Sequence, residues 1–82
     1  MIESQVKQIL ADTLNLGGRV AGMTVTTPLL GALPELDSMA VVALIGKLEE
    51  RFDIAVMDDE ITADTFATLG SLVQFVEGKL SA

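Results

Sequence analysis

Apolar side chains recur with helical spacing near the N-terminus. Between residues 2 and 16 they are separated by four, three, one and four residues, which places them on one side of a helix: Ile2, Val6, Ile9, Leu10 and Leu14. Gly17 and Gly18 follow this segment. Because glycine accepts the left-handed conformation beyond a helix end, we expect the first helix to stop there.

The same spacing predicts two further main helices. One follows Asp37, a good N-cap residue, and runs to about Phe52. Its apolar stripe contains Val41, Leu44, Ile45, Leu48 and Phe52. The other spans residues 69–80 after a capping Thr68, and its stripe contains Leu69, Leu72, Val73, Val76 and Leu80.

The segments between these helices are irregular. Residues 17–36 contain four glycines and two prolines and predict a long loop, held to the core by apolar side chains: Val25, Leu29, Leu30, Leu33 and Leu36. A short strand at Thr24–Thr27 would lack an obvious partner, and Thr62 to Phe66 is expected to form a short helix. We therefore expect one all-α domain over residues 1–82, a small bundle of three main helices and one short helix.

Composition narrows the chemistry. The chain contains no cysteine and no histidine, so it lacks disulfides, thiolate ligands and the commonest general base and metal ligand. We expect no catalytic residues and no metal site. The acidic cluster Asp53, Asp58, Asp59 and Glu60 lacks the ligand spacing of an EF-hand.

The net charge of −7 indicates which classes of partner the chain favours. It disfavours nucleic acids and anionic membranes, which require clustered lysine and arginine, and favours partners with basic surfaces. No apolar run approaches the ~20 residues of a membrane span. We expect a soluble, cytoplasmic monomer that does not insert into membranes.

The second main helix carries apolar side chains on the face that points away from the core. Opposite the core stripe lie Met39, Ala43, Gly46 and Glu50, with Val42 at the flank. An exposed apolar patch beside acidic residues predicts a docking surface for partners, which we extend to Glu49. Ser38 stands at the helix start beside this patch.

Four motifs resemble the acyl carrier protein family. Asp37-Ser38-Met39 is similar to its Asp-Ser-Leu signature, with methionine in place of leucine. The other three are Thr27-Pro28-Leu29-Leu30-Gly31 before the serine, Leu48-Glu49-Glu50-Arg51-Phe52-Asp53 at the helix end, and Thr68-Leu69-Gly70-Ser71-Leu72-Val73 at the last helix. The resemblance covers essentially the whole chain.

The resemblance implies a carrier function. A phosphopantetheinyl transferase, using Mg²⁺, would attach 4'-phosphopantetheine from coenzyme A to Ser38. The arm would carry acyl groups as thioesters in lipid or polyketide biosynthesis. Its further partners would be an acyl-loading ligase or acyltransferase and the downstream enzymes that use the acyl group. Asp37 would belong to the motif and cap the helix.

Two departures from the family pattern predict a specialised carrier rather than the housekeeping fatty-acid member. Glu35 occupies a position, three residues before the serine, where many members have glycine. Residues 40–46 contain no acid, whereas fatty-acid carriers often have one there. Two alternatives stay open: a peptidyl or aminoacyl carrier with the same fold and serine, and a helical interaction module without a prosthetic group.

Overall fold

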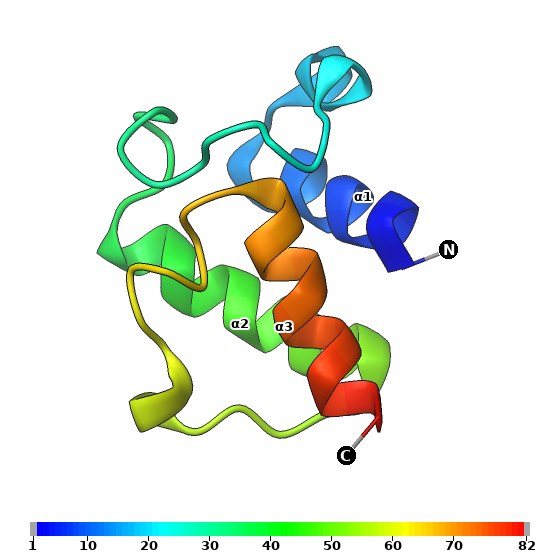
Figure 1. The fold of residues 1–82 in the computed structure, drawn as a ribbon. Coiled ribbons are helices and arrows are strands. Elements are labelled where there is room, and N and C mark those ends of the chain that lie inside the picture. Colours follow the sequence, from blue (N-terminus) through cyan, green and yellow to red (C-terminus); the bar gives the residue numbers. More distant parts are fainter. Residues whose placement is uncertain (1, 82) are drawn as a thin grey trace.

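The computed structural model describes residues 2–81, which form three α-helices and two short 3₁₀-helices. The α-helices are α1 (Ile2–Leu14), α2 (Ser38–Phe52) and α3 (Leu69–Ser81), and the 3₁₀-helices are η1 (Gly17–Gly22) and η2 (Asp58–Glu60). Figure 1 shows the long segment between α1 and α2 crossing one end of the bundle, while the segment between α2 and α3 runs along its side. The expected all-α fold is confirmed.

The main helices agree with the sequence periodicity, except that Leu80, expected in the apolar stripe of the last helix, is 43% exposed in its final turn. The helix ends have local causes. Helix α1 stops at Leu14 because Asn15 adopts a left-handed conformation with φ of 59°, two residues before the glycine pair expected to end it. Helix α2 ends in the same way at Asp53, whose φ is 55°. Among residues 2–81, none of the helices combines the length and apolarity that crossing a membrane requires.

The core collects side chains from all three α-helices. Its most enclosed members are Val6, Leu10, Leu29, Leu44, Leu48, Leu69, Leu72 and Val76. From α2, Leu44 and Leu48 are buried, while Val41, Ile45 and Phe52 pack partly buried against them. The predicted stripe of α2 is therefore its core face.

The first loop, residues 15–37, is tied to the start of α3 by main-chain hydrogen bonds. Leu29 N and Leu30 N donate to the carbonyls of Ala67 and Phe66 at 2.9 and 3.0 Å, and Leu69 N donates to Thr27 O at 3.0 Å. Pro28 and Thr68 form an isolated antiparallel bridge, but residues 2–81 contain no strand. The short strand considered at Thr24–Thr27 is not formed, because these residues make a turn closed by a hydrogen bond from Thr27 N to Thr24 O at 3.0 Å.

Two expectations for the loops are wrong. Val25 and Leu30 are 49% and 42% exposed and do not hold the first loop to the core, which Leu29, Leu33 and Leu36 do. Residues 62–66 form turns, not a helix. Thr65 N donates to Thr62 O at 3.1 Å, and Ala67 N donates to Asp64 O at 3.3 Å, so these bonds close single turns instead of a continuous helix.

Candidate functional site

Asp37 ends the first loop and begins α2. Its backbone is extended, with φ of −104° and ψ of −175°, and its Oδ1 accepts a hydrogen bond from Ala40 N at 2.8 Å. Its carbonyl oxygen accepts a second from Val41 N at 2.9 Å. The side-chain bond satisfies one of the amides that a helix start leaves unpaired, so Asp37 caps α2 as expected.

Ser38 is the first residue of α2, and its side chain is exposed. Among the described side chains, none forms a hydrogen bond with its hydroxyl, and the chain contains no histidine. The hydroxyl is thus accessible. A helix N-terminus favours negative charge by about 0.3–1 kcal/mol, so an anionic phosphodiester on Ser38 would fit this position electrostatically.

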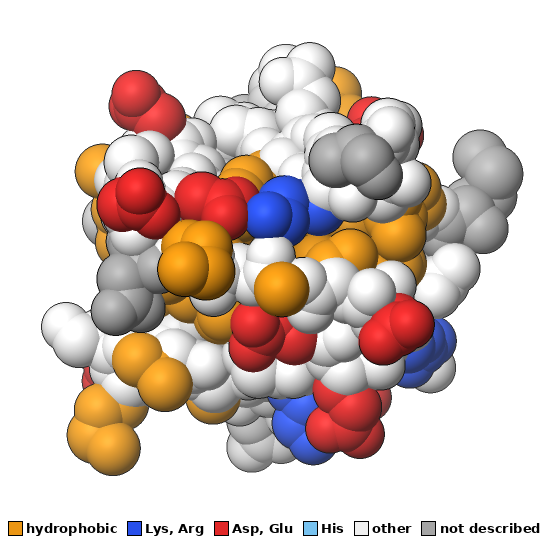
Figure 2. All heavy atoms as spheres, turned by 90° about the horizontal axis from the view of Figure 1, so that it is seen from below, with side chains coloured by type: hydrophobic (Ala, Val, Ile, Leu, Met, Phe, Trp, Pro, Cys, Tyr) orange, Lys and Arg blue, Asp and Glu red, His pale blue; other side chains and the backbone are white. Residues whose placement is uncertain are grey.

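The outward face of α2 is apolar near the serine. Met39 and Val42 are 82% and 70% exposed, and Ala43 and Gly46 are exposed beside them. Met57, from the second loop (residues 53–68), is 62% exposed, and sequence reasoning did not single it out. Figure 2 shows one face of the molecule on which apolar side chains are interspersed with acidic ones.

The two glutamates assigned to this face differ in their surroundings. Glu49 is half-buried, and its Oε2 accepts a hydrogen bond from Val56 N at 2.9 Å, which ties the second loop to α2. Glu50 is exposed and accepts no hydrogen bond from the described residues. Glu49 therefore has an internal structural contact that the sequence did not reveal.

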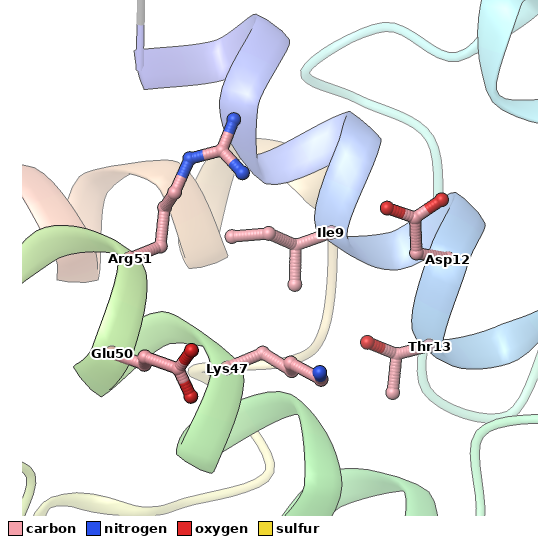
Figure 3. A pocket seen from close by; sticks show the side chains of 6 residues that line it. All are labelled: Ile9, Asp12, Thr13, Lys47, Glu50 and Arg51. Atoms are coloured by element: carbon pink, nitrogen blue, oxygen red, sulfur yellow. The ribbon is translucent and has the colours of Figure 1, made fainter.

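Two grooves flank α2. The groove between α2 and the second loop, of about 290 Å³, is lined mainly by apolar residues: Val42, Ile45, Gly46, Glu49, Val56 and Ile61. The groove between α1 and α2, of about 350 Å³, is lined mainly by polar residues: Ile9, Asp12, Thr13, Lys47, Glu50 and Arg51. In Figure 3, Lys47 extends towards Thr13 across the second groove, and Arg51 reaches towards α1, where it donates to Gln8 at 2.9 Å.

One contact near the serine was also missed. Arg19 Nη1 lies 2.6 Å from Glu35 Oε2, which joins η1 to the end of the first loop. This hydrogen-bonded guanidinium holds the pKa of the Glu35 carboxyl below its ordinary value. Opposite charges within an irregular segment carry no periodic signal, so the sequence did not pair them.

Acidic side chains do not gather into a metal centre in the described part of the chain. There, no three carboxylate, histidine or cysteine side chains lie close enough together to hold an ion.

Comparison with known proteins places this geometry in a family. A family model described as "Phosphopantetheine attachment site" matches residues 4–76. The acyl carrier protein of a Sulfurovum species is 37% identical over 73 residues, which cover 88% of this chain and 89% of that protein. The acyl carrier protein of Wolinella succinogenes is 34% identical over 77 residues, which cover 93% of each chain.

A solved structure agrees with these sequence matches. The solution NMR structure of a holo acyl carrier protein from Nitrosomonas europaea superposes with a TM-score of 0.90 at 59% identity, covering 99% of this chain and 96% of that one. The exposed serine at a helix start fits the covalent group that a holo carrier holds. The chain therefore belongs to the acyl carrier protein family, and its cofactor is covalently attached 4'-phosphopantetheine.

Proposed function

We propose that Ser38 is the attachment point and that the chain carries acyl intermediates on it as thioesters. The observation that carries this proposal is the exposed Ser38 hydroxyl at the start of α2, directly after the capping Asp37. Ser38 also lies inside the matched residues 4–76. The proposal includes no catalysis by the chain itself, since nothing in the described residues activates this hydroxyl.

The attachment step is supplied by another protein. A phosphopantetheinyl transferase removes the Ser38 proton, and the serine oxygen attacks the pyrophosphate of coenzyme A. A bond forms between Oγ and phosphorus, the bond within the pyrophosphate breaks, and adenosine bisphosphate leaves. On this chain, Asp37 fixes the first turn, and the amides of that turn favour the negative charge of the product.

Co-expression with a broad-specificity transferase, followed by intact-protein mass spectrometry, tests the assignment. We expect one added phosphopantetheine mass in the parent chain and none in Ser38→Ala. Ser4→Ala is the matched control, since Ser4 is an exposed serine in the first turn of α1. No added mass, or one that survives Ser38→Ala, would contradict the proposal and favour an interaction module or another attachment residue.

The outward face of α2 is the proposed docking surface for the transferase, for an acyl-loading ligase or acyltransferase and for downstream enzymes. The exposure of Met39 and Val42 supports this role, and Ala43 and Gly46 are exposed beside them. Glu50 is the exposed acid of this face, whereas Glu49 contributes through the loop it holds. A cytoplasmic location, a monomeric state and a specialised pathway remain predictions.

Met39→Glu tests the docking surface. Because this side chain is 82% exposed, we expect the melting temperature to stay nearly unchanged. Modification and loading should slow, since a charge would replace an apolar contact in the complex. Glu3→Gln, on α1, changes a charge away from this face and serves as control. Unchanged loading of Met39→Glu would show that Met39 does not take part in docking.

A further inference from the structure

The Arg19–Glu35 ion pair connects the two ends of the first loop close to the serine. Arg19 belongs to η1, at the start of that loop, and Glu35 stands three residues before Ser38. Their side chains meet at 2.6 Å across 16 residues of sequence. The contact closes the loop immediately before the residue proposed to be modified.

Short bonds link this pair to the first turn of α2. The carbonyl oxygen of Glu35 accepts a hydrogen bond from Asp37 N at 3.1 Å, and Asp37 Oδ1 accepts one from Ala40 N at 2.8 Å. Between them, Leu36 is only 5% exposed and anchors the backbone in the core. These hydrogen bonds therefore join the main chain of Glu35 to the capping residue and to the turn that contains Ser38.

The pair is too exposed to contribute much to global stability. The Arg19 and Glu35 side chains are 53% and 34% accessible, and solvent screens such pairs strongly. Its effect is expected to be local, on how often the loop presents Ser38 in a conformation that a transferase accepts. When that fraction falls, the apparent affinity falls in proportion, without a change in the rate at saturation.

We infer that Arg19 and Glu35 are positioning residues for the modification of Ser38: their ion pair holds the end of the first loop so that the capped first turn is presented to the transferase. This inference rests on the proposed function, in which Ser38 is the attachment residue.

Initial rates of phosphopantetheine transfer, measured at varied carrier concentration, test the inference. We expect Arg19→Gln and Glu35→Gln each to raise the KM for the carrier about threefold or more, with little change in kcat. The double variant should be no worse than either single variant, because both remove the same contact. Arg19→Lys, which keeps the charge and a donor, should restore most of the parent KM.

Lys79→Gln is the matched control. It also removes one positive charge and breaks an ion pair, the 2.7 Å contact between Lys79 and Glu60, which lies away from the α2 start. We expect its KM to rise less than that of Arg19→Gln, because this contact holds the second loop and not the end of the first loop. A second readout is independent of activity: amide exchange at Ala40, which donates to Asp37, should be faster in Arg19→Gln than in Lys79→Gln.

The possible outcomes distinguish the attachment role of Ser38 from the positioning role of Arg19 and Glu35. If the parent chain is not modified at Ser38, the proposed function fails. If it is modified but the Arg19 and Glu35 variants behave like Lys79→Gln, only the positioning role fails. Opposite shifts of KM in Arg19→Gln and Glu35→Gln would overturn it as well, because they would show a simple effect of charge. A fall in melting temperature confined to these two variants would also overturn the positioning role, because it would show that the ion pair stabilises the whole fold.

Discussion

The two loops that flank α2 are held by different kinds of contact. The first loop, before the serine, buries five apolar side chains: Leu16, Met23, Leu29, Leu33 and Leu36. The second loop, beside the apolar groove, buries Phe66 at its end, while Ile61 is only partly buried against the core. Its other ties are polar and include Glu49 to Val56 N, Lys79 to Glu60, and the carbonyls of Phe66 and Ala67, which accept from the first loop.

This difference indicates which part of the site is rigid. Burying an aliphatic side chain contributes about 1.5–3 kcal/mol, whereas a single hydrogen bond contributes about 0.5–1.5 kcal/mol net. The first loop is therefore part of the core and fixes the position of Ser38. The second loop is expected to open at a lower free energy, next to the surface proposed for docking.

The largest expected effect comes from the buried anchor of the first loop. Leu29→Ala should lower the free energy of unfolding by about 2–5 kcal/mol, because Leu29 is fully enclosed and its loss leaves a cavity. Ile61→Ala in the second loop should cost clearly less. Urea unfolding measures both, with Leu30→Ala as an exposed neighbouring control. Equal losses in the free energy of unfolding for Leu29→Ala and Ile61→Ala would show that the two loops are held equally strongly.

The main-chain tie between the first loop and α3 leaves no room at Gly70. A Cβ there would lie 2.7 Å from Val25 O, so Gly70→Ala should destabilise the fold by about 1–3 kcal/mol. Gly78→Ala, in the same helix, meets nothing within 4 Å and should be neutral or stabilising by up to about 1 kcal/mol. Thermal unfolding compares the two variants. Similar melting temperatures would show that the first loop can move away from position 70 at little cost in stability.

The polar tie of the second loop should matter less. Glu49→Ala removes the acceptor of Val56 N and should cost about 1 kcal/mol, with faster exchange of the Val56 amide. Glu50→Ala, on the same helix, removes an equal charge without a hydrogen bond to the described residues and should change little. If exchange at Val56 is the same in both variants, Glu49 does not hold the second loop.

Acid should act on both loops weakly and in the same direction. Hydrogen bonds from Lys79 and Arg19 lower the pKa of Glu60 and of Glu35 from the ordinary value of 4.5. A lowered pKa in the folded state stabilises it at pH above the ordinary value, and that contribution is lost as pH falls through the lowered pKa. Stability should therefore be insensitive to these groups above about pH 5 and decline below it.

NMR titration of the two carboxyl groups measures this effect directly. Lys79→Gln should return the pKa of Glu60 towards its ordinary value and leave Glu35 unchanged, while Arg19→Gln should do the reverse. A shift of both groups in either variant would show that the two loops are coupled.

The sequence predicted the helices well because their positions depend on burial. The apolar stripe of α2 recurs with helical period, so its core side and the opposite exposure of Met39 and Val42 follow from spacing alone. Asp37 was identified as a cap because capping depends on one side chain and the amides three residues later. The attachment role of Ser38 came from motifs rather than from periodicity.

The loops were harder to predict because main-chain groups are nearly the same in every residue, so contacts between them leave no pattern in the sequence. Residues 62–66 form turns although their composition suits a short helix, and the amides of Thr65 and Ala67 bond the carbonyls three residues before them. Val25 contributes its carbonyl oxygen to Gly70 N at 2.8 Å while its side chain is half exposed, the opposite of the expected anchoring. The bond from Glu49 to Val56 N depends on a loop path that the sequence pattern does not define.

The main-chain tie between the first loop and α3 also affects how this protein can change over evolution. Thr24, Val25 and Thr26 are exposed, and the contacts to Leu69 N and Gly70 N use carbonyl oxygens that every amino acid provides. New side chains at these three positions can therefore alter the surface near one end of the bundle without loosening the attachment. The surface there can vary while the fold is kept.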